Sequence, residues 1–267
     1  MTSDAPAAGK RVSMTSPEYA GTGVHHSLYL PIGWKKGGQY PVIVEFTGNY
    51  FPQAGSTGKV QDASLGFGIS GGQFIWVVLP FVAEDGKANA QTWWGDEKAT
   101  IAYAKSNIPR ICLEFGGDPD RVFLCGFSRG AIAVNYIGLA DDGIARLWAG
   151  FISHDHYDGQ RAWGGTSWGS NLEKYRTGAA ARLSRLGQRP VLIMQAPDTG
   201  NIKEYLGKNQ RIDQFTFLDV PMAEIFRKLP TEDIIHLHND KWLLFESSAA
   251  DSARNWLQRH AKMLNAG

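Results

Sequence analysis

Ser128, in the segment Gly126-Phe-Ser-Arg-Gly130, is the residue of this chain best placed to do chemistry. An apolar run that starts at Arg121 leads into the segment, and a stretch of small residues follows it. A sharp turn from strand to helix exposes the hydroxyl of the residue at its tip. Glycines two positions before and after that residue let the strand and the helix approach closely. The spacing therefore predicts a serine nucleophile at Ser128.

The same Gly-x-Ser-x-Gly spacing occurs around two other serines, Ser70 and Ser167. Ser70 comes before an apolar run, not after one, and Ser167 follows a polar, glycine-rich stretch that cannot form a buried strand. Only Ser128 has the strand before it and the helix after it, which is the context that the motif needs. Ser70 and Ser167 are therefore interpreted as ordinary loop serines.

A serine nucleophile needs a histidine that takes its proton and an acid that orients the histidine. In a parallel α/β sheet the three residues follow one another in the chain as serine, acid and histidine. Two late histidines, His236 and His238, precede the last helical stretch. His238 begins the polar part of its loop and is the predicted base, with His236 as the alternative.

The acid is expected at the end of a strand that follows Ser128, because reactive groups gather at the carboxyl ends of parallel strands. The apolar run 191–195 is followed closely by Asp198, which is the predicted acid. A helix cap or a turn is the alternative role for Asp198. Asp155 and Asp158, which follow an earlier apolar run, are the alternative acids.

Two backbone N–H groups are expected to form the oxyanion hole, where negative charge develops during acyl transfer. One belongs to the residue after the nucleophile, Arg129. The other comes from the loop after an early strand, here Thr47-Gly48-Asn49. Asn49 is the predicted donor and Gly48 the alternative.

The elements that must position these residues are apolar runs that alternate with helical stretches. Strands are predicted at 24–30, 41–46, 74–79, 121–125, 147–153, 191–195 and 215–220, and helices at 96–115, 129–139, 172–186 and over most of 242–264. Because the strands are apolar throughout, they indicate a mostly parallel central sheet with helices on both faces. The chain of 267 residues is predicted to be a single α/β domain, 1–267. Residues 1–20 are expected to be loosely ordered and 155–170 to form an irregular insertion near the site.

The composition limits the kinds of binding partner that this chain is expected to have. The net charge is +1, so no basic surplus would hold a nucleic acid, and no apolar run is long enough to cross a bilayer. Residues 1–11 are polar and contain no hydrophobic segment of a secretion signal. The expectation is a soluble protein, cytoplasmic or secreted with its signal removed. The oligomeric state is not indicated.

The segment from Gly116-Gly-Asp118-Pro-Asp120 through Ser128 resembles the esterase and polyhydroxybutyrate-depolymerase-like branch of the α/β-hydrolase superfamily. His238-Asn-Asp240-Lys-Trp242 is similar to a histidine loop of that branch. The resemblance runs from about Val24 to the C-terminus. It implies the α/β-hydrolase fold, a Ser-Asp-His triad and carboxylic ester hydrolysis through an acyl-enzyme. The sequence departs at Thr47-Gly48, where relatives usually carry His-Gly.

Aromatic residues outside the apolar runs suggest where a substrate binds. Trp93, Trp94, Trp163 and Trp168 lie in predicted loops, and aromatic rings on loops can stack on sugars or aromatic groups. Packing over the sheet edge is the alternative role. With His154 as a polar wall of the site, they predict a small or carbohydrate-linked ester as substrate. No metal or other cofactor is expected.

Two other functions remain open. The segment 153–159 looks like the His-x-His-x-Asp-His motif of metallo-β-lactamase-type hydrolases, and His154 and His156 could bind zinc there. Gly159 replaces the terminal histidine of that motif. The other alternative is a non-catalytic binding module built on a hydrolase fold.

Overall fold

An eight-stranded sheet forms the centre of the molecule in the computed structural model, which describes residues 1–207, 212–227 and 236–263. Its strands are β1 (Arg11–Met14), β2 (His26–Tyr29), β3 (Tyr40–Phe46), β6 (Ile75–Leu79), β7 (Gly117–Phe127), β8 (Gly150–His154), β9 (Val191–Gln195) and β10 (Phe215–Asp219). They lie in the order β1-β2-β6-β3-β7-β8-β9-β10. The pairs β1–β2 and β2–β6 are antiparallel, and all the other pairs are parallel. The predicted mostly parallel sheet is confirmed.

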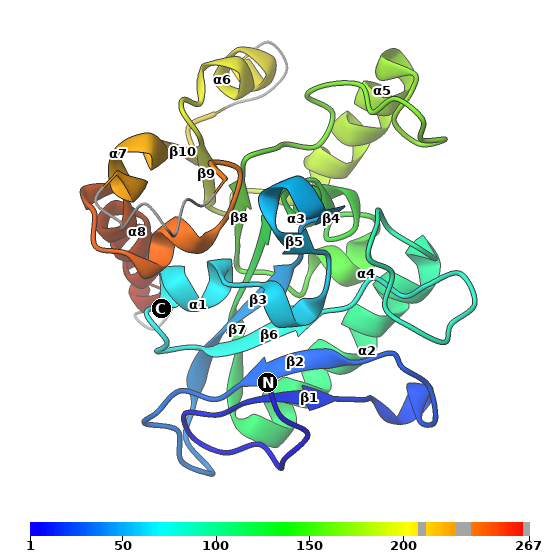
Figure 1. The fold of residues 1–267 in the computed structure, drawn as a ribbon, viewed down its shortest axis with the longest axis vertical. Coiled ribbons are helices and arrows are strands. Elements are labelled where there is room, and N and C mark those ends of the chain that lie inside the picture. The colour runs from blue at the N-terminus through cyan, green and yellow to red at the C-terminus, as the bar shows by residue number, and fades with distance from the viewer. Residues whose placement is uncertain (208–211, 228–235, 264–267) are drawn as a thin grey trace.

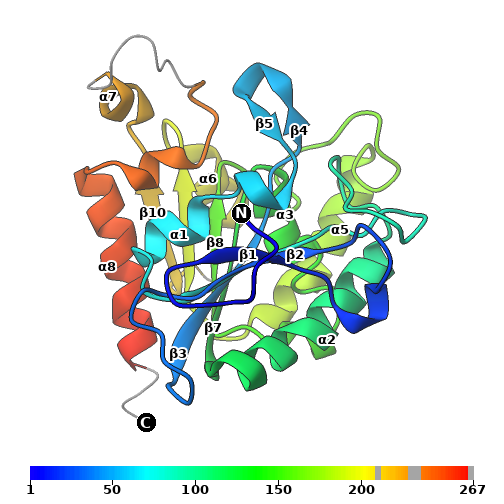
Figure 2. The ribbon, with the colours of Figure 1, turned by 60° about the horizontal axis from the view of Figure 1, so that its bottom comes forward.

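Helices cover both faces of this sheet (Figures 1 and 2). The helices are α1 (Leu65–Ser70), α2 (Glu97–Phe115), α3 (Arg129–Tyr136), α4 (Asp142–Ala145), α5 (Leu172–Leu183), α6 (Gly200–Gly207), α7 (Met222–Phe226) and α8 (Ser248–Met263). Buried residues of α1, α7 and α8 belong to one apolar core, and those of α2 to α6 belong to the other. The sheet therefore separates two cores, as the apolar strands require.

The two cores receive alternate residues of each central strand. On β3, Val42, Val44 and Phe46 enter the core under α2 and α3, while Ile43 enters the core under α1 and α8. This alternation is the normal pleat of a strand. Because both faces are covered, the strand is apolar at almost every position. The exception is Glu45, which is fully buried on the α1 side.

The N-terminal residues are more ordered than expected. Residues 1–20 were predicted to be loose, but they include β1, which forms the antiparallel edge of the sheet. Val12 is fully buried there. The Arg11 guanidinium donates to the carbonyls of Val60 and Ala63 and lies over the ring of Trp76. These contacts tie β1 to the body of the protein.

The long segments around the site differ in structure. Residues 50–72 contain the hairpin β4 (Tyr50–Phe51) and β5 (Ser56–Thr57) as well as α1. Residues 155–170 form turns and bends, as expected of an irregular insertion. The predicted closing helix over 242–264 begins later, at Ser248, after the short 3₁₀ helix Lys241–Leu244. The other 3₁₀ helices of the described residues are Pro17–Tyr19, Pro52–Ala54, Val60–Asp62 and Ser184–Leu186.

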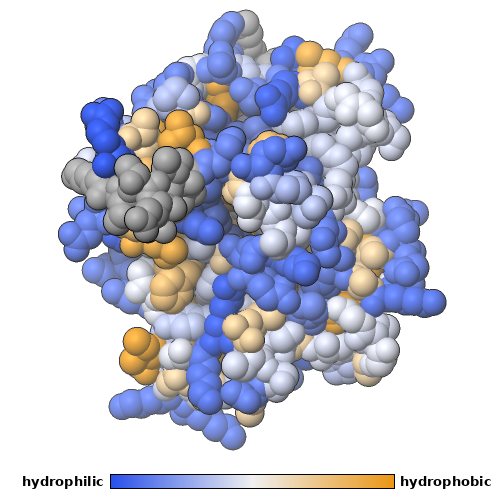
Figure 3. Space-filling model, viewed as in Figure 1, coloured by the Kyte–Doolittle hydropathy of each residue, from blue (hydrophilic) through white to orange (hydrophobic). Residues whose placement is uncertain are grey.

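The surface is mainly polar on the face shown in Figure 3, where apolar side chains form small separate groups. Within residues 1–207, 212–227 and 236–263, the most exposed large apolar side chains are those of Leu113 and Ile32, at 87% and 82%. Among the described residues, no helix combines the length and the apolar character that crossing a membrane would need.

Candidate active site

Ser128 lies at a sharp turn between β7 and α3. Its backbone has φ 54° and ψ −117°, a conformation that non-glycine residues rarely adopt. A Cβ on Gly126 would lie 2.2 Å from the carbonyl carbon of Gly130, and a Cβ on Gly130 would lie 1.9 Å from the carbonyl oxygen of Phe46. Neither position has room for a side chain. The two glycines thus permit the close crossing that lifts Ser128 to the end of the sheet.

His238 faces Ser128 from the loop that precedes the last helices. The Ser128 hydroxyl donates to Nε2 of His238 at 2.9 Å. The ring of His238 packs beside that of Phe127, with 4.7 Å between centroids. His236, the alternative base, is exposed, and its Nδ1 accepts the backbone N–H of His238. The structure therefore brings the predicted base to the serine and leaves His236 as a support of the loop.

The acid that faces His238 is Asp155, not the predicted Asp198. Nδ1 of His238 donates to Oδ2 of Asp155 at 3.1 Å. The order of the strands explains the correction. Asp155 follows β8, which is paired directly with the β7 strand that carries Ser128, whereas Asp198 follows β9, one strand further away. Sequence order alone could not separate the two strands.

The other two carboxylates have structural roles. Asp198 is exposed, and its Oδ1 accepts the N–H of Gly200, the first residue of α6. This is a turn at the start of α6, and a turn was one of the alternative roles that the sequence offered for Asp198. Asp158 is buried and forms a two-pronged ion pair with Arg182, with N–O distances of 2.8 and 2.9 Å. Neither carboxylate is placed to orient His238.

The surroundings of Asp155 favour its charged form. Burial alone raises the pKa of this carboxyl, but the imidazoles of His154 and His238 and the N–H of Ala196 outweigh burial, so the pKa lies below its usual value. The Ala196 N–H donates to Asp155 at 2.9 Å. Asp155 is therefore an anion at neutral pH, as a group that orients an imidazolium must be.

Two stretches of backbone lie where the oxyanion hole was predicted. Arg129 is the first residue of α3, and the first N–H groups of a helix have no acceptor within it. Gly48 lies against the serine, since a Cβ there would be 3.5 Å from Cβ of Ser128. Asn49 follows, and its side chain accepts the N–H of Trp93 at 2.7 Å. Any oxyanion role of Asn49 thus belongs to its backbone N–H.

The predicted tryptophans of the substrate site divide into half-buried and buried ones. Trp93 and Trp163 are half-buried and contact each other, with 5.3 Å between ring centroids. Trp94, by contrast, is buried and stacks on Tyr136. Trp94 is therefore a core residue, because its ring fills the space between α3 and the loop. Trp93 and Trp163 keep part of their surface exposed.

His154 was predicted to line the site, but the structure buries it completely. The indole N–H of Trp242 donates to its Nε2 at 2.9 Å. Its Nδ1 contacts the Met194 carbonyl and its Nε2 also contacts the Asn239 carbonyl, both at 3.2 Å. His154 thus joins β8, β9 and the residues after the histidine loop, and it has no free atom for a substrate or a metal.

His156, which was considered only as a metal ligand, lies close to the candidate triad. Its ring is 5.4 Å from the ring of His238 and 5.0 Å from that of Trp163. Burial, followed by the nearby Arg161, lowers the pKa of His156 to about 3, so the ring is neutral at physiological pH. No group of three or more possible metal-ligating side chains occurs among the described residues. Proximity to His238 was not visible in the sequence spacing.

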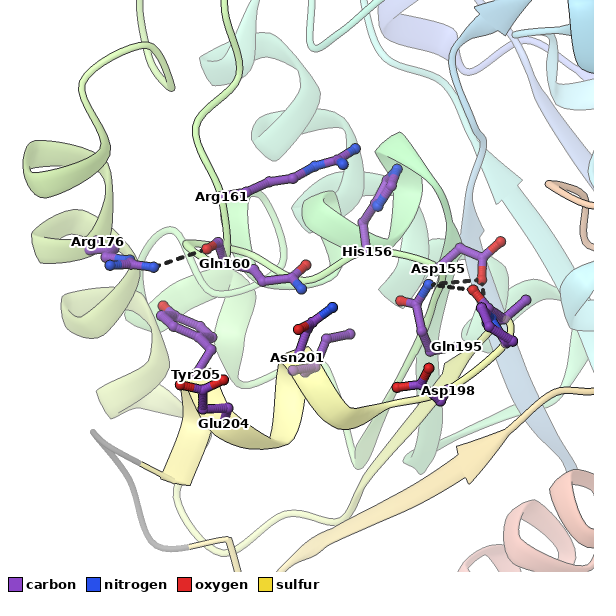
Figure 4. Close-up of a pocket in the computed structure, with 13 residues that line it drawn as sticks. Asp155, His156, Gln160, Arg161, Arg176, Gln195, Asp198, Asn201, Glu204 and Tyr205 are labelled. Carbon is purple, nitrogen blue, oxygen red and sulfur yellow. Dashed lines mark hydrogen bonds between the residues drawn. The ribbon is translucent and has the colours of Figure 1, made fainter.

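Two cavities reach residues of the candidate triad. One, of about 550 Å³, lies beside Asp155 and His156 and is also lined by Arg161 (Figure 4). In Figure 4 the Arg161 side chain extends towards His156. The second cavity, of about 400 Å³, is lined by His238 and Gly48 among other residues. The second cavity therefore reaches the imidazole of His238, whereas the first reaches its partner Asp155.

No protein-family model matches the sequence, and no curated protein matches it. Solved structures do match. A sugar hydrolase from Lactococcus lactis superimposes with a TM-score of 0.58 at 15% identity, over 96% of this chain and 100% of that one. A thermostable esterase gives 0.55 at 15% identity, over 94% of this chain and 62% of the esterase. This chain thus spans less than two thirds of the esterase.

A feruloyl esterase module from Clostridium thermocellum, solved with sinapinate, also matches, with a TM-score of 0.52 at 16% identity over 80% of this chain and 81% of the module. The sheet order, the elbow at Ser128 and these neighbours identify the α/β-hydrolase fold. The resemblance drawn from the sequence is confirmed at the level of the fold.

Proposed function

We propose that this protein is a serine carboxylic ester hydrolase that works through an acyl-enzyme. The observation that carries the proposal is the hydrogen-bonded chain from Ser128 Oγ through His238 to Asp155, at 2.9 and 3.1 Å. Nucleophile, base and orienting acid are the three groups that acyl transfer by a serine requires. Asp155 takes the role that the sequence assigned to Asp198.

In the proposed reaction, His238 takes the proton of Ser128 as its oxygen attacks the ester carbonyl. The backbone N–H groups of Arg129 and of Gly48 or Asn49 stabilise the negative oxygen of the tetrahedral intermediate. His238 then protonates the leaving alcohol. Water, activated by the same imidazole, releases the acyl group and restores the serine.

The aromatic residues support a small aromatic or carbohydrate-linked ester as the substrate. Trp163 contacts His156, and His156 contacts the ring of His238, so the indoles of Trp163 and Trp93 lie close to the reacting groups. Half-buried indoles can stack on sugar or phenyl rings. Two of the structural neighbours are a sugar hydrolase and a feruloyl esterase module with sinapinate bound. A panel of acetyl, feruloyl and acetylated-sugar esters would rank these classes.

The test compares Ser128→Ala with a matched control, Ser167→Ala. Both serines lie in a Gly-x-Ser-x-Gly segment, but Ser167 is an exposed turn residue. With p-nitrophenyl acetate as substrate, Ser128→Ala should lower kcat by about 10⁶-fold, the loss typical of removing a serine nucleophile. Ser167→Ala should keep the activity of the unmodified protein.

Labelling tests the covalent step directly. A fluorophosphonate should modify the unmodified protein at Ser128, and peptide mapping should find the adduct there. A protein that hydrolyses no ester of the panel and takes no label at Ser128 would contradict the proposal and favour a binding module. Activity that survives Ser128→Ala but is abolished by a chelator would instead favour a metallohydrolase.

A further inference from the structure

The side chain of Arg129 is a buried cation without a carboxylate partner among the described residues. Only 1% of its surface is exposed, and none of the ion pairs formed by the described residues includes it. Burial lowers the pKa of Arg129 to about 9, which leaves it charged at neutral pH. An unpaired buried charge is costly unless hydrogen bonds satisfy it. Something other than an acid must therefore stabilise this guanidinium.

Backbone carbonyls stabilise it, and most of them belong to the loops of the site. Nε donates to the Thr47 carbonyl at 3.3 Å, and Nη2 donates to the Gly48 carbonyl at 2.8 Å. Nη1 donates to the Trp93 carbonyl at 2.6 Å. Further contacts reach the carbonyls of Ala90 and Gly58 and the hydroxyl of Thr47. One side chain thus holds the predicted oxyanion loop and the loop that carries Trp93.

The direction of these carbonyls fixes the direction of the amides on the other side of each peptide. In a trans peptide the C=O and the following N–H point in opposite directions. The only cis peptide among the described residues joins Ala196 and Pro197. Because the carbonyls of Thr47 and Gly48 point at the guanidinium, the N–H groups of Gly48 and Asn49 point away from it.

Trp93 is also held by this network of hydrogen bonds. Its φ of 49° is left-handed, which is strained for a bulky residue. Its N–H donates to the Asn49 side chain and its carbonyl accepts from Arg129, so both sides of the strained residue are held. The oxyanion loop 47–49 and Trp93, which contacts Trp163, are therefore linked through the same guanidinium.

We propose that the guanidinium of Arg129 is a positioning residue, which aims the Gly48 and Asn49 amides at the oxyanion by holding the carbonyls of Thr47 and Gly48. The inference rests on the proposed esterase function and adds a role for the side chain of a residue whose backbone N–H is itself a predicted donor. It acts through the loop and touches no substrate atom.

The experiment compares Arg129→Met and Arg129→Lys with Arg182→Met as the matched control. Arg182 is a largely covered arginine, with 15% of its side chain exposed, but Asp158 pairs with it and it lies outside the oxyanion loop. Activity is measured per site titrated by fluorophosphonate, at a temperature where each variant is folded. Each variant keeps the backbone N–H at position 129, so the change reports the side chain.

Arg129→Met should lower kcat per titrated site by about 10²- to 10³-fold, the effect of losing an oxyanion donor, while KM changes little. The affinity for a boronic acid, which forms a tetrahedral adduct with the serine, should fall with kcat. Arg129→Lys keeps the charge but has fewer donors, so its kcat per titrated site should lie between those of Arg129→Met and the unmodified protein. Arg182→Met should lower the melting temperature and leave kcat per titrated site unchanged.

The inference is overturned if Arg129→Met keeps a kcat per titrated site within about threefold of the unmodified protein. A threefold change is well under the tenfold that 1.4 kcal/mol represents. If Arg129→Met does not fold, the same comparison with Arg129→Lys decides it. Failure of the proposed function would give a different result, because the unmodified protein would then lack both ester turnover and label at Ser128.

Discussion

The two sides of Ser128 are held in place by buried groups of opposite charge. On the oxyanion side, the guanidinium of Arg129 binds the carbonyls of Thr47 and Gly48. On the histidine side, carboxylates bind backbone N–H groups at the start of α1. Oδ2 of Asp240, two residues after His238, accepts from Ser64 and Leu65 at 3.0 and 3.1 Å. Each loop is therefore anchored through backbone polar groups of the scaffold.

The two sides differ in how pH can affect them. Glu45 lies next to Asp240 on the histidine side, where it accepts from the Gly66 N–H and the Trp76 indole N–H, both at 2.8 Å. Burial, and then the carboxylate of Asp240, raise the pKa of Glu45. Arg129 keeps its charge at neutral pH and below. The histidine side can thus change its charge in the acid-to-neutral range, whereas the oxyanion side cannot.

The largest expected effect is on the histidine side, at Asp155. Asp155→Asn should lower kcat by about 10⁴-fold, because an amide favours the wrong tautomer of His238 and cannot stabilise the imidazolium. Asp198→Asn is the matched control and should leave kcat close to that of the unmodified protein, since Asp198 lines the cavity beside Asp155 but accepts its hydrogen bond from the Gly200 N–H and not from His238. Steady-state kinetics on p-nitrophenyl acetate checks both. A large loss of kcat in Asp198→Asn with none in Asp155→Asn would mean that Asp198, after β9, is the acid.

This reversal of the acids shows what the sequence could supply and what it could not. The apolar runs predicted most strands because both faces of the sheet are covered. The strand before it and the helix after it selected Ser128, and its place in the polar loop before the last helix selected His238. Choosing between Asp155 and Asp198 needed the pairing of β8 with β7, which depends on contacts far apart in the chain. The edge strand β1 was missed because its stability comes from long-range pairing with β2.

The burial of certain polar side chains could not be predicted from the sequence either. Arginine and histidine are usually found at the surface or half-buried, so nothing in the sequence marks Arg129 or His154 as core residues. Both are satisfied by partners from distant segments, the Thr47 carbonyl for Arg129 and the Trp242 indole for His154. Trp94 was misassigned for the same reason, since a loop position says little about which way a ring points.

The second prediction concerns the pH dependence of stability through Glu45. Because its native pKa is raised, the folded protein holds this proton more tightly than the unfolded chain does. The stabilisation is complete below the unfolded pKa of about 4.3 and is lost as pH rises through the native pKa. The advantage of the unmodified protein over Glu45→Gln should therefore shrink across this range, by about 1.4 kcal/mol for each unit by which the native pKa is raised. Urea unfolding at a series of pH values measures it.

Glu18 provides a control of opposite sign for that experiment. Hydrogen bonds from Arg110 and then Ser106 lower the pKa of Glu18, so the stabilisation that it gives is present above the unfolded pKa and is lost as pH falls. Its side chain is 43% exposed, so solvent screens the pair and the effect should be small. Equal pH slopes for the unmodified protein and Glu45→Gln would contradict a raised pKa at Glu45.

A third, smaller effect is expected when the anchor of the histidine loop is removed. Asp240→Ala leaves the Ser64 N–H without its acceptor and should destabilise the protein by about 1–3 kcal/mol, the cost of an unsatisfied buried donor. Asp240→Asn keeps an acceptor oxygen and should lose less. Removing the charge should also lower the pKa of Glu45 and flatten its pH dependence. Urea unfolding of both variants, with and without Glu45→Gln, separates the two effects.

The smallest expected effect is at His156, whose ring lies between those of His238 and Trp163. A protonated His156 would repel the imidazolium that forms on His238, whose ring is 5.4 Å away. Burial lowers the pKa of His156 to about 3, so this repulsion is absent at any pH where the reaction runs. His156→Asn should therefore leave the acid limb of the kcat profile in place and change kcat by less than about tenfold, or 1.4 kcal/mol. His238→Asn in the same assay should remove the activity, whereas a shifted acid limb in His156→Asn would mean that His156 carries charge and that the histidine side has a second titrating group.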